Sequence, residues 1–385
     1  MTKQYLDAVH RVMNEGTRKP SRTGIDTISK FNVNMEFDLR NGQFPLLTTK
    51  RINWFNIVAE NLWFLSGATD IGFLKKHGIK FWDAWADEDG NVPSAYGNFW
   101  RHFPVPSRQR FDWNDGDISE LEMLPNTQRI ENGEAVTVPV EGYNDQIAWV
   151  VDQLKTNPMS RRLVVSAWAP GNAQTSKLPP CHAMFVLNVQ NLPPGDRLAR
   201  MHEFDMNRGC ERCGQKFPGP LPPGGADVFC PAVPAEPHLC LHLTQRSCDM
   251  GLGVPYTIAG YAFILSLLAH LTGLKAGIFS HSLVDAHIYT KKPDGTFGGA
   301  KKPTGELYED PDYDHIPKLR EQLTRAPRPL PKLTINPELK SLEDVAMLTD
   351  LTDGALVSDS EDVLLDTFRL TGYDPHPPLR MKAAV

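Results

Sequence analysis

Residues 177–185 read Lys-Leu-Pro-Pro-Cys-His-Ala-Met-Phe, so a cysteine follows a Pro-Pro pair and precedes an apolar run. Because proline cannot donate to a strand ladder, we predict a strand that starts at Cys181 or just after it. A thiol at a strand end lies where a rigid sheet can border a cleft. Free cysteine is among the most buried residue types, so this stretch alone is compatible with a core thiol or with a nucleophile.

The composition limits the class of protein. The chain has 385 residues, of which 41% are hydrophobic, and this is enough for a large core. We find neither an apolar run of about 18 residues nor a charged-then-apolar leader, so we expect a soluble, cytoplasmic protein. The net charge of −6 argues against nonspecific nucleic-acid binding. Six cysteines in a chain of this length do not make a disulfide scaffold, which favours catalytic or metal-binding cysteines.

Hydrophobic periodicity predicts an α/β chain. Predicted helices cover residues 3–16, 53–66, 144–156, 257–272 and 317–324, and predicted strands cover 27–38, 163–168, 185–189, 239–249, 276–283 and 333–335. The helix at 257–272 is apolar on nearly all sides, which is typical of a central buried helix. Three polar, turn-rich stretches interrupt the pattern and predict insertions at 104–142, 191–237 and 291–314.

Several polar side chains are candidates for a site. Arginines on separate segments could hold a phosphate dianion, because the guanidinium fork matches phosphate oxygens. These arginines are Arg22, Arg161, Arg162 and Arg246. An arginine near Cys181 would also stabilise the nucleophilic thiolate. Glu60 is a lone carboxylate on an apolar helix, where either a structural partner or a site role would explain it. Tryptophan and tyrosine between residues 81 and 101 indicate core packing or a stacking surface for a planar ligand.

The insertion at 191–237 carries a Cys-x-x-Cys pair. Such a knuckle indicates tetrahedral zinc, with unliganded thiols or a redox pair as alternatives. The candidate metal ligands are Cys210, Cys213, Cys230 and His238. The chain has no Walker loop and no GxGxxG motif, so neither ATP nor a dinucleotide is indicated. A thiolate beside a phosphate pocket and an aromatic wall suits covalent catalysis on a phosphorylated planar substrate.

With these residues in view, the chain resembles the thymidylate synthase family. The matching segments are Pro-Ser-Arg-Thr-Gly (20–24), Phe-Pro-Leu-Leu-Thr-Thr-Lys-Arg (44–51), Asn-Leu-Trp-Phe-Leu-Ser-Gly (61–67), Trp-Asp-Ala-Trp-Ala-Asp (82–87), Tyr-Gly-Asn-Phe-Trp-Arg (96–101), Ser-Arg-Arg-Leu-Val-Val-Ser-Ala-Trp (160–168), Leu-Pro-Pro-Cys-His-Ala (178–183), Gln-Arg-Ser-Cys-Asp-Met-Gly-Leu-Gly-Val-Pro (245–255), His-Ile-Tyr (287–289), Arg-Pro-Leu-Pro-Lys-Leu (328–333) and Gly-Tyr-Asp-Pro-His-Pro (372–377). The resemblance implies one α/β (α+β) catalytic domain over residues 1–385. It further implies a large mixed sheet, a central buried helix and an obligate homodimer with its sheets packed back to back.

The resemblance also implies a reaction. A one-carbon unit would pass from 5,10-methylenetetrahydrofolate to C5 of a pyrimidine deoxynucleoside monophosphate, giving dTMP from dUMP or 5-methyl-dCMP from dCMP. Cys181 would add to C6 of the ring, and Tyr96 with Glu60 would relay the C5 proton; Arg246 and His182 complete the catalytic set. A hydroxymethylase is one alternative. A non-catalytic relative that binds nucleotide or RNA is the second, and the intact Cys181 argues against it.

The resemblance assigns binding roles by position. The expected substrate-binding residues are Arg22, Arg161, Arg162, Gln245, Ser247, Thr257, His287 and Tyr289, with Arg161 and Arg162 reaching across from the partner subunit. The expected folate contacts are Lys50, Trp82, Asp249, Gly253, Tyr261 and Val385.

Some positions depart from the family pattern. Relatives that act on uracil have asparagine, and those that hydroxymethylate dCMP have aspartate, where this chain has Thr257. One short hydroxyl cannot both accept from N3–H and donate to O4, so discrimination between bases should weaken. Gly260, where serine is usual, is expected to enlarge this neighbourhood, and residues 283–285 replace a usual Gly-Gly-Asp turn. Trp82 and the synthase-like tail at 381–385 favour a dry site and a methyl product.

Overall fold

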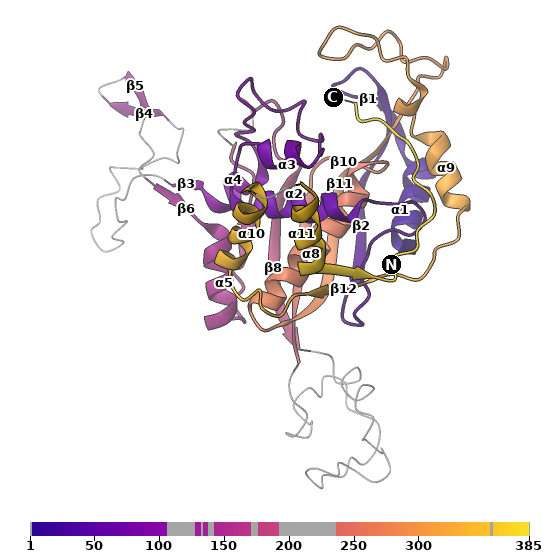
Figure 1. The fold of residues 1–385 in the computed structure, drawn as a ribbon. Helices are drawn as coiled ribbons and strands as arrows, with labels where there is room; N and C mark the ends of the chain where they lie inside the picture. Colours follow the sequence, from indigo (N-terminus) through magenta and orange to yellow (C-terminus); the bar gives the residue numbers. More distant parts are fainter. Residues whose placement is uncertain are drawn as a thin grey trace, which may run out of the picture.

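The computed structural model describes residues 2–105, 128–131, 134–137, 142–170, 176–191, 236–354 and 357–384. Its largest sheet has seven strands (Figure 1). In order across the sheet these are β1 (Thr17–Pro20), β2 (Asp26–Asp38), β11 (Lys275–Thr290), β9 (Pro237–Gln245), β8 (His182–Asn191) and β7 (Val164–Ser166), with β10 (Cys248–Asp249) paired to β11. Because β9 and β10 run parallel to β11 while the other neighbours are antiparallel, the sheet is mixed, and the predicted fold class is confirmed.

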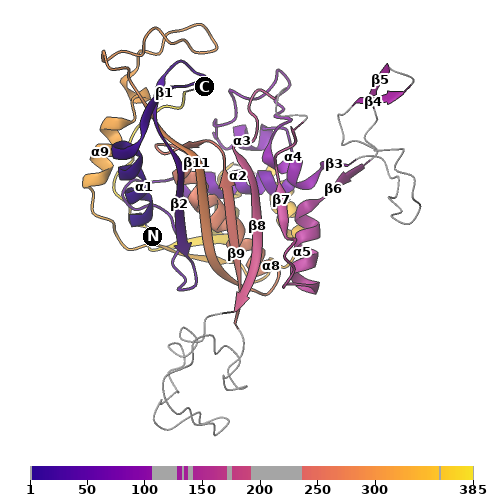
Figure 2. The same ribbon diagram turned by 180° about the vertical axis from the view of Figure 1, so that it is seen from behind.

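Helices cover one face of this sheet. In Figure 2 the strands β2, β11, β9 and β8 are in the foreground, and α2 (Trp54–Ser66) and α8 (Gly253–Leu271) lie behind them. Buried residues alternate with more exposed ones along β8 and β9, which is typical of a sheet with one face on a core. The opposite face is the surface on which a back-to-back dimer would form, and that pairing stays a prediction.

The central helix α8 is buried, as its apolar sequence predicts. Among the described residues it is the one helix long and apolar enough to cross a membrane by length and composition, and 83% of that window is buried inside the protein. Our expectation that the chain lacks an apolar run of about 18 residues is therefore wrong. The helix starts at Gly253, earlier than predicted, because Pro255 is tolerated in a first turn where its missing N–H has no helical partner.

The remaining elements complete the helical layer and the edges. They are α1 (Thr2–Glu15), α3 (Gly72–Lys76), α4 (Tyr96–Arg101), β3 (Phe103–Val105), β4 (Gln128–Glu131), β5 (Glu134–Thr137), β6 (Gly142–Asn144), α5 (Gln146–Thr156), the 3-10 helix η2 (Pro311–Tyr313), α9 (Ile316–Thr324) and β12 (Lys332–Ile335). Local signals explain the boundaries of α2. The Asn53 side chain accepts from the Asn56 N–H at its start, and Gly67 adopts φ 78° at its end.

Two regions differ from the prediction. The strand predicted at 276–283 continues to Thr290, straight through the residues that replace the Gly-Gly-Asp turn. The segment treated as a tail contains α10 (Leu342–Gly354), α11 (Val357–Thr367) and β13 (Phe368–Thr371), and β13 pairs with β12. Their apolar positions were hidden among acidic residues, and the helices α10 and α11 form by packing on α2.

Candidate active site

Cys181 lies directly before β8 and beside the end of β9. These strands are antiparallel with His182 opposite Gln245, so the residue before β8 meets the residue after β9. Accordingly, the backbone N–H of Arg246 donates to the Cys181 carbonyl at 2.8 Å. The ladder stops at the Pro-Pro pair, as predicted, because neither proline has an N–H. The strand register thereby sets the candidate nucleophile beside a cation.

The carbonyls of the same Pro-Pro pair fix the Arg246 side chain. Its Nε donates to the Pro180 carbonyl at 2.9 Å and its Nη2 to the Pro179 carbonyl at 2.5 Å. Its guanidinium carbon lies 5.4 Å from the centroid of the Trp168 ring. Burial raises the pKa of the Cys181 thiol, and the positive charge of Arg246 opposes that rise. The thiol is therefore protonated at rest, with a cation ready to stabilise its anion.

Further predicted residues surround this thiol. Burial raises the pKa of Cys181, and after Arg246 the hydrogen bonds with Tyr96 and Ser247 and the charge of Arg22 also oppose the rise. Burial likewise raises the pKa of Tyr289, on which the charges of Arg22 and Cys181 both act. The structure thus brings two of the four candidate arginines, Arg22 and Arg246, close to the nucleophile. The hydroxyls of Ser247 and Tyr289 lie near it as well.

Tyr96 lies against both Cys181 and His182. The Cys181 N–H donates to the Tyr96 hydroxyl at 3.3 Å, and the Tyr96 ring stacks on the His182 imidazole with centroids 4.4 Å apart. Trp82 meets the Tyr96 ring edge-on at 5.7 Å. It also donates from Nε1 to Glu60 Oε1 at 2.8 Å. These aromatic residues therefore belong to the core and to the site at once.

Glu60 has both a structural partner and the properties of a proton-transfer group. Burial raises the pKa of its carboxyl to about 7, and the hydrogen bond from Trp82 opposes the rise. A carboxyl that titrates near neutrality can take up and release a proton. Burial raises the pKa of Tyr96 well above its usual value, so its hydroxyl stays protonated. Glu60 and Tyr96 form a candidate proton relay.

The Thr257 hydroxyl is already engaged within the protein. It donates to the Gly253 carbonyl at 3.1 Å and lies 3.2 Å from His182 Nε2. Burial lowers the pKa of His182 to about 3, so the imidazole is neutral and its Nε2–H can donate to Thr257. Tyr261, 3% exposed, meets the His182 ring edge-on at 5.2 Å. The single proton of Thr257 is thus committed to its own helix.

Asn61, which the sequence analysis did not single out, occupies the space beside Gly260. A Cβ on Gly260 would lie 2.9 Å from Asn61 Nδ2 and 3.3 Å from its Oδ1. The Asn61 amide is 4% exposed and donates to the Ile57 carbonyl at 2.7 Å. The expectation that Gly260 enlarges the neighbourhood is therefore wrong, because α2 supplies the side chain that α8 lacks. A second polar residue next to Glu60 on an apolar helix was the available signal.

The amide of Gln245 is also used internally. Its Nε2 donates to the Ser247 carbonyl at 3.0 Å, and its Oε1 accepts from His281 Nε2 at 2.9 Å. His281 is fully buried, and burial lowers its pKa well below the usual value, so it is neutral. Gln245 therefore supports the turn that carries Arg246, and its contact with substrate stays a prediction.

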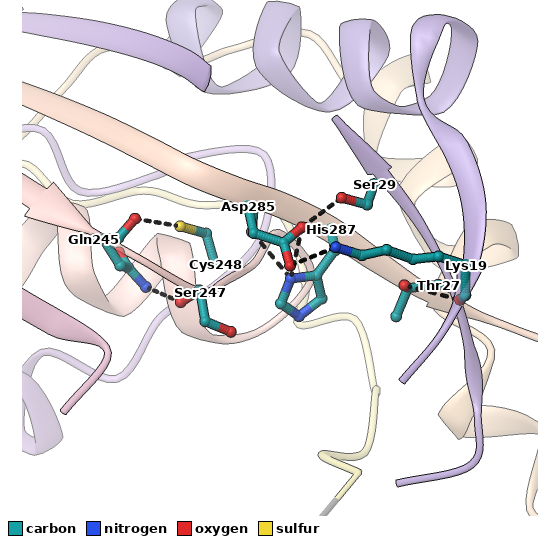
Figure 3. A network of polar contacts seen from close by, with 8 residues as sticks. All are labelled: Lys19, Thr27, Ser29, Gln245, Ser247, Cys248, Asp285 and His287. Carbon is teal, nitrogen blue, oxygen red and sulfur yellow. Dashed lines mark hydrogen bonds and ion pairs between the residues drawn. The ribbon is translucent and has the colours of Figure 1, made fainter. Parts of the chain in front are cut away.

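Asp285 ties three strands together beside this turn (Figure 3). Its carboxylate accepts from Lys19 Nζ at 2.7 Å and from the Ser29 hydroxyl. The His287 Nδ1 lies 3.0 Å from the Asp285 carbonyl. Lys19 belongs to β1, three residues before Arg22, so this ion pair holds the start of the arginine loop against β11. Lys19 was missed because the short strand β1 has no apolar periodicity, and Ser29 because its partner Asp285 lies on another strand far along the chain.

Asp249, Lys50 and His315 form a second polar cluster around Gly251. The Asp249 carboxylate accepts from the Gly251 N–H at 2.8 Å, and Lys50 Nζ donates to the Gly251 carbonyl at 2.5 Å. Burial lowers the pKa of Lys50 to about 8, with Asp249 opposing. Burial acts to raise the pKa of Asp249, but His315, whose Nδ1 is 3.4 Å away, holds it at about 2. Tyr289 lies close enough for the Asp249 charge to act on it, and an ionised carboxylate at this place can accept hydrogen bonds from N–H groups of a ligand.

Other predicted site residues are not gathered here. Arg161 and Arg162 are exposed on the loop before β7, outside the contacts around Cys181. Val385 and the candidate metal ligands Cys210, Cys213 and Cys230 lie outside the described residues. His238 is described, and its Nδ1 lies 2.8 Å from the Glu236 carbonyl. Among the described residues, no group of three or more His, Cys, Asp or Glu side chains could hold a metal ion, which leaves the zinc prediction without support.

Comparison with protein families agrees with this arrangement. A family model described as thymidylate synthase matches residues 3–385, which is nearly the whole chain including its insertions. Enzymes of this family use methylenetetrahydrofolate to transfer a one-carbon group to C5 of a pyrimidine nucleotide. The protein belongs to the thymidylate synthase family and is a C5 methyl- or hydroxymethyltransferase of pyrimidine nucleotides.

Proposed function

We propose that this enzyme methylates C5 of a pyrimidine deoxynucleoside monophosphate through a covalent bond between Cys181 Sγ and C6 of the ring. The observation that carries the proposal is the set of contacts joining Cys181 to Arg246 on one side and to Tyr96 on the other. Methylenetetrahydrofolate would supply the one-carbon unit. The residues of the chain would supply the nucleophile, the charge that stabilises it and the proton relay.

Cys181 begins the reaction. Its buried thiol needs to lose a proton, and Arg246 stabilises the resulting anion. Addition of sulfur to C6 makes C5 an enolate-like carbon that can attack an electrophilic methylene group. The C5 proton then leaves to the relay of Tyr96 and Glu60, and a carboxyl with a pKa of about 7 suits that step. Departure of the sulfur from C6 at the end restores the ring double bond and frees Cys181 for the next turnover.

The phosphate would bind between Arg22 and Arg246, whose charges both act on Cys181. His287 and Tyr289 would hold the sugar hydroxyl. We also propose a homodimer in which Arg161 and Arg162 complete the phosphate site of the other subunit. The exposure of both side chains in a single chain supports this role.

We expect the site to discriminate only weakly between uracil and cytosine. The proton of Thr257 goes to Gly253, so this hydroxyl has no donor left for O4 of uracil. A site that hydrogen-bonds one edge of a substrate rejects its analogue by about 10⁴-fold or more, whereas a site without such bonds discriminates far less. We therefore propose that both dUMP and dCMP react, with a ratio of kcat/KM within about a hundredfold.

A methyl product is favoured over a hydroxymethyl product. Trp82 is 7% exposed and packs against Trp63, Phe64 and Tyr96. This aromatic wall keeps water from the methylene stage, where water attack would give the alcohol and hydride transfer gives the methyl group.

One experiment tests the reaction, the base and the product. The protein is incubated with methylenetetrahydrofolate and each of dUMP, dCMP, UMP and CMP, and the nucleotides are analysed by mass spectrometry. We expect the deoxynucleotides to gain a methyl group, with dihydrofolate formed in equal amount. Gain of a hydroxymethyl group without dihydrofolate would replace the methylation proposal, and absence of any C5 product would refute the transfer itself.

A further inference from the structure

The insertion at 291–314 has no part in the proposed chemistry, yet it holds the C-terminal segment, residues 380–384. The Lys382 N–H donates to the Asp312 carbonyl at 2.9 Å. The Lys382 ammonium pairs with the Asp310 carboxylate and lies 5.8 Å from the Tyr313 ring centroid. Arg380 Nε lies 3.2 Å from the Asp312 carboxylate. Figure 1 shows the chain end returning to β1 beneath this insertion.

The insertion is built to receive that segment. Its aromatic side chains Phe297, Tyr308 and Tyr313 pack with Ile25 in a small apolar cluster, and Ala384 packs against the same cluster. The Asp310 carboxylate accepts from the Asp312 N–H at 2.9 Å and so caps η2. Asp310 is therefore held in position by the insertion itself, independently of Lys382.

His315 joins the segment to the second polar cluster. It is fully buried directly after the insertion, and its Nε2 lies 2.9 Å from the Lys382 carbonyl. Its Nδ1 lies 3.4 Å from Asp249 Oδ1. Met381 is 8% exposed, and a Cβ on Gly251 would lie 3.1 Å from its sulfur. The segment thus rests directly on the loop that carries Asp249.

We propose that the insertion at 291–314 is a platform that holds the C-terminal segment against the Asp249–Gly251 loop before any substrate binds. Asp310, Asp312 and His315 are positioning residues for that segment. Chain ends are poorly ordered unless they are tied down, and ordering a segment on binding weakens apparent affinity. A C-terminal segment that is already held in place avoids this loss of affinity. The part of the inference that concerns folate and product rests on the proposed function.

The platform itself is tested without any substrate. In the full-length double variant Asp310→Asn/Asp312→Asn, asparagine at 310 can still accept from the N–H of residue 312, while both ion pairs are lost. We expect carboxypeptidase to release C-terminal residues about five- to tenfold faster from the double variant than from the wild type. This size of effect corresponds to the loss of two partly exposed ion pairs, Lys382–Asp310 and Arg380–Asp312. The matched control is Glu306→Gln, because Glu306 pairs with Lys302 within the same insertion. Release at the wild-type rate in the double variant, with an unchanged melting temperature, overturns the platform.

The functional consequence is tested by kinetics. The double variant should raise KM for methylenetetrahydrofolate about five- to tenfold with a smaller change in kcat, and should raise the share of hydroxymethyl product. His315→Gln retains an amide donor for the Lys382 carbonyl and should rescue most of the loss seen in His315→Ala. Equal loss in both His315 variants, or a fall in kcat alone, overturns the positioning role. If the wild type converts no nucleotide, the proposed function fails while the digestion still decides the platform.

Discussion

The two sides of the site are built in different ways. On the side proposed to bind nucleotide, Cys181 and Arg246 face each other because two adjacent strands end together, and backbone carbonyls fix the guanidinium. On the side proposed to bind folate, Lys50, Asp249 and His315 come from distant segments and meet around one glycine. The Cys181–Arg246 pair needs only strand register. The cluster at Gly251 needs three segments that are far apart in the chain to meet.

This difference predicts which kinetic constant each side controls. Substitutions at Cys181, or at the residues of α2 and α8 proposed to serve the nucleotide, should act on the chemical step or on base selection, because the cluster at Gly251 is unchanged. Substitutions in the cluster at Gly251 should act on binding and on water exclusion. The following variants test that division in order of expected effect.

Cys181→Ser should lower kcat at least about a thousandfold, because a hydroxyl is a far weaker nucleophile than a thiolate. Nucleotide binding measured by calorimetry should stay close to wild type, since Arg22 and Arg246 are unchanged. Product formation is followed by mass spectrometry. Activity near that of wild type would show that Cys181 is not the nucleophile, and the register argument for the nucleotide side would fail with it.

Glu60→Gln should lower kcat about a hundredfold, because the amide keeps the bond from Trp82 but cannot transfer the proton. The folded-state pKa of Glu60 is raised to about 7 from 4.5, so the folded protein binds more protons between these values. Stability therefore falls as pH rises through this window. In the wild type the free energy of unfolding in urea should fall by about 2.5 kcal/mol between pH 5 and pH 8 on account of Glu60, and this fall should be absent in Glu60→Gln. A variant with wild-type kcat would exclude Glu60 from the relay.

Thr257→Asn should raise the preference for dUMP over dCMP by about ten- to a hundredfold, because an amide offers a donor and an acceptor to the uracil edge. The preference is measured as the ratio of kcat/KM in competition between the two nucleotides. Thr257→Val, which keeps the shape and removes the hydroxyl, is the control and should leave the ratio nearly unchanged. A large shift in the valine variant would mean that the Thr257 hydroxyl reads the base after all.

Lys50→Met should raise KM for methylenetetrahydrofolate about tenfold and change kcat little, because the loop at Gly251 loses a donor. Lys50 has a folded-state pKa of about 8, below its ordinary 10.5, so the unfolded chain binds more protons between these values. Stability therefore rises with pH across that window in the wild type, and the rise should be absent in the variant. Loss of kcat with unchanged KM would contradict the division between the two sides.

Much of the nucleotide side could be predicted from the sequence. The Pro-Pro pair stops a ladder wherever it occurs, so the strand end at Cys181 follows from local chemistry. The lone carboxylate Glu60 on an apolar helix was a visible anomaly, and the structure gives it a hydrogen-bonded partner and a raised pKa. These signals act over a few residues, which is why a sequence reveals them.

The errors came from contacts between distant segments. Gly260 lacks a side chain, but the space beside it belongs to Asn61 of another helix. The apolar run of α8 matches a membrane span in length and composition, and its burial within the protein agrees with the core helix that its sequence predicts. The residue pattern of one helix or strand does not specify which side chains of other elements pack against it.

The sequence by itself determined the family, the strand end that carries Cys181 and most helices and strands, because propensity, proline and hydrophobic period are local properties. The tertiary structure alone decided that Thr257 meets His182, that His315 reaches Asp249, and that the 291–314 insertion meets the C-terminal segment. These pairings join residues far apart in the chain. Their energies depend on distance and burial in space, which only the folded chain fixes.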